Sequence, residues 1–380
     1  MDAFSKRILS FETPPGDGHY AGAMARERRV SPPTAGSDAP TPRSGSGQPP
    51  RAGGELALIA EIRRRSAMLP AARGGELRLG IGDDCAILRP RAGEEIVITT
   101  DFTLEGRHFR RDWHPPASVG HRALARGLSD LAAMGSRPSA AFLSLALPRA
   151  MAADREWVDG FLQGLMDLAK RVRVPLAGGD TAEAPGEYAL ADIVLLGAVP
   201  AGRALRRGGA RPGDRLFCSG ALGGAAAELR ALAAGGTAGE ELDHPQLFPE
   251  PRLELGQALR RRGLASAAID LSDGLSTDLR HLCAASGVRA EVEADSLPLH
   301  RRLHGLERAT ALDLALNGGE DYELLFTAAS GVRVPRQLGG VPLAEIGRML
   351  KADPTKPTVS LVSADGSRSE LVAGGWEHLQ

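Results

Sequence analysis

The sequence predicts an α/β (α+β) protein with two domains behind an N-terminal extension. The chain has 380 residues, of which 43% are hydrophobic and 24% charged, a size and balance typical of about two globular domains. Strand-like and helix-like segments alternate along most of the chain. A stretch rich in glycine, arginine and turn signals, GRALRRGGARPGD (202–214), interrupts this alternation about halfway along the folded part. We therefore expect a domain boundary there.

Residues 1–52 are predicted to be a disordered extension. They contain repeated Pro, Gly, Ser and Arg, as in SPPTAGSDAPTPRSGSGQPP, and cannot bury enough apolar surface to offset the entropy of ordering. An alternative explanation is a start codon assigned too far upstream. The folded part should begin near Gly53, where GGELALIAEIRRR has the pattern of a short amphipathic helix. The chain then divides into the extension (1–52), an N-terminal domain (53–200) and a C-terminal α/β domain (201–380).

The later elements follow in order. GIGDDCAIL (80–88) has the composition of a buried strand, apart from its two aspartates. Further runs with strand composition cover residues 94–100, 139–148, 189–199, 215–220, 288–293 and 322–329. Apolar residues at helical spacing predict two core-facing helices, one carrying Val119, Ala123, Leu124, Leu128 and Leu131 and the other Trp157, Phe161, Leu165, Leu168 and Val172.

Composition excludes several classes of function. The formal charge of −1 gives no reason to expect nucleic acid or an anionic membrane as a partner. No apolar run is long enough to cross a membrane and no secretory signal is visible, so we expect a cytoplasmic protein. The three cysteines are too few and too far apart for a disulfide framework or a zinc site, and each is expected to be buried.

Acidic residues beside glycines or other small residues recur at the ends of apolar runs. A single aspartate in such a place usually caps a helix or closes a turn. Many of them concentrate negative charge that a cation must neutralise. They are Asp83 and Asp84 in GIGDDC, Asp101 in VITTD, Asp130 in GLSDLAAMG, Asp180 in LAGGDT, Asp273 and Asp278 in DLSDGLSTD, and Glu320 and Asp321 in NGGEDYELLF.

The chain itself supplies little of that cation. It has four lysines, none in a P-loop, and no G-x-G-x-x-G segment opens a helix after a strand. Mg²⁺ prefers oxygen ligands and usually takes one or two carboxylates together with phosphate oxygens. Many aspartates therefore indicate several Mg²⁺ ions and a polyphosphate substrate, which is the setting of phosphoryl transfer.

Seven segments, taken together and in order, resemble the thiamine-monophosphate kinase family. They cover nearly the whole chain from about residue 53, and the series SDLAAMG, DLSDGL and GGEDYEL is the most specific part. The segments are GIGDDCAIL, ITTDFTLEGRHF, ALARGLSDLAAMGSRP, LAGGDTA, GRALRRGGARPGD, AIDLSDGLSTDL and NGGEDYELLFT.

The resemblance implies the two-domain fold of the aminoimidazole-ribonucleotide synthetase superfamily, with an N-terminal domain that binds metal and ATP and pairs into a homodimer. It implies ATP and thiamine monophosphate as substrates and several Mg²⁺ ions. The implied metal positions are Asp84, Thr99, Thr100, Asp101, Asp130, Asp180, Asp273 and Asp278, of which Asp84, Asp130 and Asp273 are the carboxylates expected to act in the transfer. The implied nucleotide contacts are Gly179, Asp180, Arg207 and Thr277, and the implied substrate contacts are His108, Glu320 and Trp376.

Several alternatives stay open. The polar contact in SDGLSTDL is Ser276 or Thr277, and Arg207 competes with Arg203 and Arg206. The family often has Asn at the site of Arg126. SGALGGA (219–225) fits either a phosphate-facing helix start or close packing of a strand on a helix. Successive strand residues face opposite sides, so Asp83 and Asp84 can both reach one cluster only if the strand ends there. The resemblance implies Asp84 as the direct ligand and leaves Asp83 as a residue behind the ligands or in the turn.

An anionic acceptor phosphate needs no separate nucleophile and base, so the expected mechanism is a direct in-line transfer without a phosphoenzyme. The rival functions are another ATP-using enzyme of the superfamily, such as aminoimidazole-ribonucleotide or selenophosphate synthetase or the hydrogenase-maturation dehydratase, and a non-catalytic sensor of nucleotides or thiamine phosphates. Structural calcium sites are disfavoured because no D-x-[DN]-x-[DN]-G loop occurs.

Overall fold

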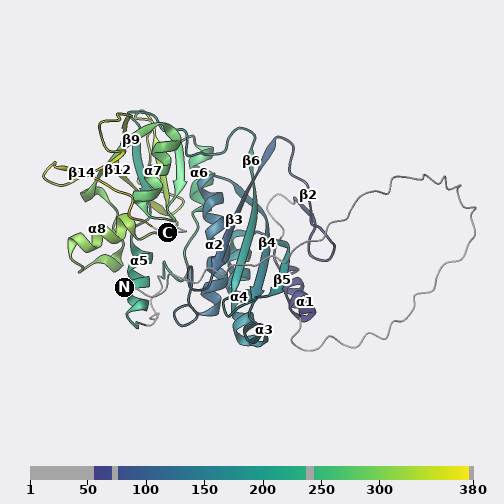
Figure 1. Cartoon of the computed structure of the whole chain (residues 1–380). Coiled ribbons are helices and arrows are strands. Elements are labelled where there is room, and N and C mark those ends of the chain that lie inside the picture. The colour runs from purple at the N-terminus through teal and green to yellow at the C-terminus, as the bar shows by residue number, and fades with distance from the viewer. Residues whose placement is uncertain (1–54, 71–75, 237–243, 376–380) are drawn as a thin grey trace, which may run out of the picture. The chain divides into compact units, whose positions relative to one another are not determined.

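The computed structural model describes residues 55–70, 76–236 and 244–375 (Figure 1). Its helices are α1 (Glu55–Ser66), α2 (Pro116–Ala133), α3 (Arg149–Ala153), α4 (Arg155–Val172), α5 (Gly224–Ala233), α6 (Leu253–Arg261), α7 (Leu275–Ser286) and α8 (Arg308–Asn317), with 3₁₀ helices at Ala294–Ser296 and Arg301–Leu303. Its strands are β1 (Leu77–Leu79), β2 (Ile87–Leu88), β3 (Glu94–Leu104), β4 (Arg137–Leu147), β5 (Leu176–Glu183), β6 (Leu190–Pro200), β7 (Arg215–Ser219), β8 (Ala267–Asp270), β9 (Val288–Glu293), β10 (Leu324–Ala328), β11 (Gln337–Leu338), β12 (Val341–Lys351), β13 (Val359–Val362) and β14 (Arg368–Glu370). The predicted disorder of residues 1–52 and the predicted contact Trp376 lie outside the described residues.

The N-terminal half is built on a four-stranded sheet in the order β3-β6-β4-β5. Only β4 and β5 run parallel; the other neighbours are antiparallel. Helix α2 packs on one face of this sheet, and α4 packs against α2 (Figure 1). The two helices approach closely because Gly120 and Gly164 lie where they cross: a Cβ on Gly120 would come 1.8 Å from the carbonyl oxygen of Phe161, and one on Gly164 would come 1.8 Å from that of Ala117.

The other face of this sheet carries exposed apolar side chains in the single chain. Along β3 the side chains alternate, so that Thr99 and Asp101 face α2 while Ile98 and Phe102 point the opposite way. Ile98 is 66% exposed and Phe102 is 55% exposed, so two large apolar side chains of the edge strand β3 face solvent in the single chain.

The C-terminal half contains the second large sheet, in the order β14-β13-β9-β12-β7-β10-β8, with β11 paired to β12. Its strands and helices enclose a separate apolar cluster that includes Leu216, Ile269, Leu279, Val292 and Ile346. No helix in the described ranges is both long and apolar enough to cross a membrane.

The predicted alternation of helices and strands is confirmed, with two instructive errors. The predicted strand at 80–88 is wrong for most of its length, since β2 covers only Ile87 and Leu88 and residues 80–86 form an exposed turn. Cys85 in this turn is exposed, against expectation, whereas Cys218 and Cys283 are buried. The central strand β12 was not predicted; its register shifts between Glu345 and Gly347 and its buried residues recur at every third position, so the alternation typical of a strand is absent.

Candidate active site

Most of the predicted site residues lie in two cavities. The loop cavity has a volume of about 700 Å³, is lined by α1, the 80–86 turn and the 176–181 segment, and contains Asp84, Gly179 and Asp180. The acidic cavity has a volume of about 270 Å³, lies where α2, β3 and the end of β8 meet, and contains His108, Asp101, Asp130, Asp273 and Glu320. Thus residues from both halves of the chain come together in the acidic cavity.

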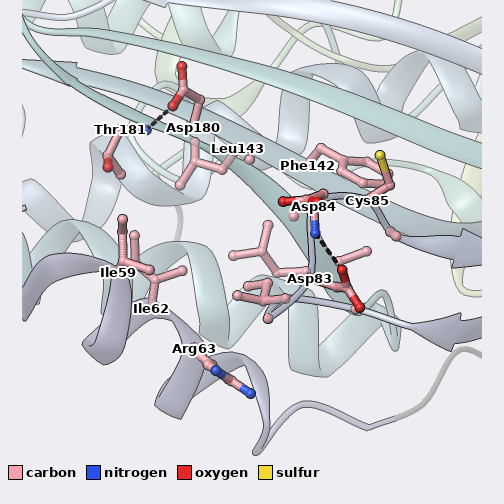
Figure 2. Close-up of a pocket in the computed structure, with 18 residues that line it drawn as sticks. Ile59, Ile62, Arg63, Asp83, Asp84, Cys85, Phe142, Leu143, Asp180 and Thr181 are labelled. Carbon is pink, nitrogen blue, oxygen red and sulfur yellow. Dashed lines mark hydrogen bonds between the residues drawn. The ribbon is translucent and has the colours of Figure 1, made fainter. Parts of the chain in front are cut away.

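The loop cavity holds its carboxylates through local hydrogen bonds only (Figure 2). The backbone N–H of Asp84 donates to Asp83 Oδ1 at 2.9 Å, and that of Thr181 donates to Asp180 Oδ1 at 2.9 Å. The Asp84 carboxylate itself accepts no hydrogen bond from the described residues. This geometry agrees with the interpretation of Asp83 as a turn residue, and the ligand role of Asp84 stays a prediction.

The alternation of β3 divides the Thr99–Thr100–Asp101 run between two faces. On the α2 face, the Thr99 hydroxyl donates to Asp130 Oδ2. On the opposite face, the Thr100 hydroxyl donates to Asp192 Oδ1 at 2.8 Å. A strand side chain cannot reach both faces, so the structure brings Thr99 and Asp101 together with Asp130 and leaves Thr100 apart from them.

Crowded carboxylates dominate the electrostatics of the acidic cavity. Burial, together with the charge of Asp130, raises the pKa of Asp101 to about 7. The same two causes raise the pKa of Asp270, at the end of β8, to about 7, although the Ser129 hydroxyl donates to Asp270 Oδ2 at 2.8 Å. Asp101 Oδ2 is buried and accepts no hydrogen bond from the described residues. The cluster therefore carries negative charge that the protein only partly compensates.

Asp278 lies in the first turn of α7 and hydrogen-bonds to the turn that follows β8. Asp278 Oδ2 accepts the backbone N–H groups of Asp273 and Gly274, each at 3.1 Å, and so closes the turn from the first turn of α7. Asp278 is buried, and burial together with the charge of Asp270 raises its pKa to about 8. The role of Asp278 as a metal ligand stays a prediction, because one of its carboxylate oxygens already accepts two backbone hydrogen bonds.

The choice between Ser276 and Thr277 can now be argued from contacts. Ser276 is fully buried; its hydroxyl donates to Asn317 Oδ1 at 2.7 Å and accepts the backbone N–H of Gly374 at 3.2 Å. The Thr277 side chain makes no hydrogen bond with the described residues and is only half-buried. Thr277 is therefore the residue of this pair with a hydroxyl available to a nucleotide.

The loop before β10 presents Glu320 in a strained backbone conformation. Glu320 and Tyr322 have φ values of 58° and 49°, which are rare for residues with side chains. Arg122 Nη2 donates to Glu320 Oε1 at 2.6 Å, and Gln246 Nε2 donates to Glu320 Oε2 at 2.9 Å. Burial alone would raise the pKa of Glu320, but the charges of Arg122 and Arg126 outweigh it and hold the pKa at about 2. Glu320 is thus fixed as a carboxylate.

Two further predicted contacts, His108 and Arg207, lie near these groups. His108 is buried at the edge of the acidic cavity, where its Nδ1 accepts the backbone N–H of Leu104 at 3.0 Å. Arg207 is exposed, and its charge is close enough to lower the pKa of Asp270, which favours Arg207 over Arg203 and Arg206. Their functional roles stay predictions.

The two interpretations of SGALGGA can also be compared. The backbone N–H of Gly223 donates to both carboxylate oxygens of Asp321, at 3.1 and 2.9 Å. A Cβ on Gly223 would come 2.9 Å from the backbone nitrogen of Ala315. The Asp321 carboxylate thus takes the backbone N–H at the start of α5 that a phosphate would otherwise bind. The contacts therefore favour close packing as the role of SGALGGA.

Comparisons with known proteins show which family this chain belongs to. Two family models match, the AIR synthase related protein N-terminal domain at residues 82–199 and its C-terminal domain at 211–359. The thiamine-monophosphate kinase of Escherichia coli K12 is 42% identical over 308 residues, which is 78% of this chain and 90% of that protein. The chain belongs to the thiamine-monophosphate kinase family.

Solved structures support the same assignment. The thiamine-monophosphate kinase from Stenotrophomonas maltophilia K279a is 40% identical, with a TM-score of 0.71 over 83% of this chain and 98% of that chain. A structure described as AaThiL complexed with AMPPCP and TMP is 28% identical, with a TM-score of 0.65 over 88% of this chain and all of that chain. The predicted two-domain fold of the superfamily is thereby confirmed.

Among family members, a magnesium site must be judged on the residues of this chain. Within the described ranges, no group of three or more His, Cys, Asp or Glu side chains is placed so that it could hold a metal ion by itself. The buried, unbonded Asp101 Oδ2 and the raised pKa of Asp101 nonetheless show a carboxylate group whose charge the nearby Arg126 only partly compensates. Mg²⁺ keeps several waters and takes phosphate oxygens as ligands, so a site with few protein ligands suits it. The residues therefore fit magnesium.

Sequence reasoning missed several residues that shape the kinase site. Asp270 carried the same signal as the aspartates that were found, since it ends the apolar strand AAID. Arg122 and Gln246 gave no such signal, because only the folded chain brings them to Glu320. Tyr322 lies inside the NGGEDYELLF segment, but it was not singled out. Arg126 was noted only as a departure from the family.

Proposed function

We propose that this protein transfers the γ-phosphoryl group of ATP to thiamine monophosphate and forms thiamine diphosphate and ADP. The observation that carries the proposal is the acidic cavity, where Asp101, Asp130 and Asp273 lie beside His108 and Glu320. This arrangement of carboxylates occurs in a chain that is 41% and 42% identical to two thiamine-monophosphate kinases.

The reaction is a direct displacement. An oxygen of the thiamine monophosphate phosphate forms a bond to the γ-phosphorus while the bond from this phosphorus to the β,γ-bridging oxygen breaks, and the electron pair leaves with ADP. The acceptor carries about −1.5 to −2 charge at pH 7, so no side chain has to remove a proton to activate it. The chief task of the protein is to bring two anions together in line.

The chain divides this task between its cavities. Asp84 and Asp180 in the loop cavity and Asp101, Asp130 and Asp273 in the acidic cavity would hold magnesium. When bound, Mg²⁺ would neutralise phosphate charge and polarise the transferred group. Gly179, Arg207 and Thr277 would contact the nucleotide, and His108, Glu320 and Trp376 would hold the thiamine end.

We also propose that two chains pair through the open face of the N-terminal sheet. Its exposed Ile98 and Phe102 form part of an apolar surface that a second copy of the same face would cover. Measurement of the molar mass in solution tests this, with Phe102→Asp as the variant; a single-chain mass for the wild-type protein would refute it.

The cytoplasmic location also stays a prediction.

The decisive experiment incubates the protein with ATP, Mg²⁺ and thiamine monophosphate and measures thiamine diphosphate. The expected result is formation of thiamine diphosphate that depends on both substrates and on Mg²⁺. Failure to form it under these conditions would overturn the proposal. A radiolabelled phosphoenzyme trapped from ATP alone would contradict the direct transfer, because the mechanism has no covalent intermediate.

A further inference from the structure

Arg126 places a guanidinium in the acidic cavity. It lies on α2, four residues before Asp130, and lines the same cavity as Asp101 and Asp273. Its side chain is only 14% exposed. A buried arginine usually has all its donors paired, so its bonding is informative.

The bonding of Arg126 is incomplete. Its Nη1 donates to Tyr322 Oη at 3.1 Å and to Glu320 Oε1 at 3.4 Å. Its Nη2 lies 3.7 Å from Asp101 Oδ1, which is too far for a hydrogen bond, and makes no other contact with a described acceptor. Its Nε is buried and also lacks a partner among the described residues. Part of the guanidinium is therefore available for an acceptor that the chain does not provide.

The position of Arg126 indicates which acceptor this is. On one side lies Asp101, a predicted magnesium ligand, and on the other side lies Glu320, a predicted contact of the thiamine end. The acceptor phosphate must sit between the magnesium ions and the thiamine rings, because it is bonded to the thiamine and receives the γ-phosphoryl group. A guanidinium matches a phosphate in both charge and planar fork geometry.

We propose that Arg126 binds the phosphate of thiamine monophosphate and is a specificity-determining residue of this enzyme; the inference rests on the proposed function. Burial disfavours the charge of Arg126, but the neighbouring Tyr322 and Glu320 raise its pKa above the usual range, so it stays cationic. Asparagine at this position could donate a hydrogen bond but could not neutralise charge. The Arg126 side chain thus neutralises part of the phosphate charge that magnesium would otherwise have to neutralise.

The competing explanation is structural, with Arg126 only holding Glu320 and Tyr322 in place. The two explanations differ for thiamine, which has the rings but no phosphate. If Arg126 binds the phosphate, Arg126→Asn weakens binding of thiamine monophosphate and leaves binding of thiamine nearly unchanged. If Arg126 only positions Glu320, both ligands lose affinity alike.

The test is calorimetric titration of both ligands into the full chain with Mg²⁺ and AMPPCP, a setting that needs no turnover. We expect Arg126→Asn to raise the Kd for thiamine monophosphate about 100-fold, the effect typical of removing a charged, well-placed donor, and to change the Kd for thiamine by less than about threefold. Tyr322→Phe, which removes the hydroxyl that Arg126 contacts but keeps the charge, should change either Kd only a few-fold, roughly the worth of one neutral hydrogen bond. Arg261→Asn on the exposed side of α6 is the matched control and should leave both constants unchanged.

The outcomes separate cleanly. Equal losses for both ligands in Arg126→Asn, or unchanged affinity for thiamine monophosphate, would overturn the inference. A wild-type protein that binds thiamine monophosphate through Arg126 but forms no thiamine diphosphate would refute the proposed function and leave the inference standing. A wild-type protein that binds no thiamine monophosphate would refute both.

Discussion

The loop cavity and the acidic cavity carry the same kinds of residue but are built in different ways. In the acidic cavity, Glu320 is held by Arg122 and Gln246 across the two halves of the chain, and Asp101 and Asp270 are buried. In the loop cavity, Asp84 and Asp180 are exposed; the Asp180 carboxylate accepts only the backbone N–H of Thr181, and the Asp84 carboxylate accepts no hydrogen bond from the described residues (Figure 2). Folding therefore fixes the acidic cavity, whereas under the proposed function metal and nucleotide would order the carboxylates of the loop cavity.

The largest expected effect is in the acidic cavity. Asp130→Asn should lower kcat by about 1,000-fold or more, because it removes a charge that acts on the transferred group. The melting temperature should stay the same or rise, since the change relieves repulsion with Asp101 and Asp270. Kinetics and thermal unfolding measure both; Asp167→Asn on the exposed side of α4 is the control. Substantial activity together with a lowered melting temperature would show that Asp130 has only a structural role.

A smaller effect, of a different kind, is expected in the loop cavity. Asp84→Asn should lower activity by about 100-fold and raise the Mg²⁺ concentration needed for half-maximal rate, without a change in melting temperature. The reason is that the Asp84 carboxylate bonds to nothing in the described chain. Asp83→Asn is the matched variant, and its effect should appear mainly in stability, because Asp83 holds the turn. If Asp83→Asn impaired magnesium dependence more than Asp84→Asn, the assignment of the two residues would have to be reversed.

The smallest expected effect is on the free energy of unfolding. It tests whether the acidic cavity is already formed in the folded chain before any ligand binds. The folded pKa of Glu320, about 2, lies below its usual value of 4.5, so its carboxylate stabilises the fold above about pH 4.5 and this contribution is lost as the pH falls towards 2. Without ligands, Glu320→Gln should lower the free energy of unfolding by about 2 kcal/mol at pH 7. The difference should shrink between pH 4.5 and pH 2.

Denaturant unfolding at several pH values measures this difference, with Glu187→Gln in an exposed loop as the control. A difference that does not change with pH would mean that Arg122 and Arg126 do not stabilise the Glu320 carboxylate.

The sequence by itself determined the order of elements and most of the acidic residues, because both leave local signals. Apolar spacing located α2 and α4, and aspartates at the ends of apolar runs located Asp101, Asp130 and Asp273. Local signals failed where the local pattern was misleading. The irregular strand β12 lacks the alternation that indicates a strand, and the apolar flanks of the 80–86 turn resemble a strand.

Only the tertiary structure decided which residues share a cavity and which face each one presents. The pleat of β3 sends Thr100 away from Thr99, and Asp278 turns inward to close a backbone turn. Arg126 meets Glu320 across 194 positions of sequence. Such partners leave no trace in local composition, because the contact exists only once two distant segments have packed together.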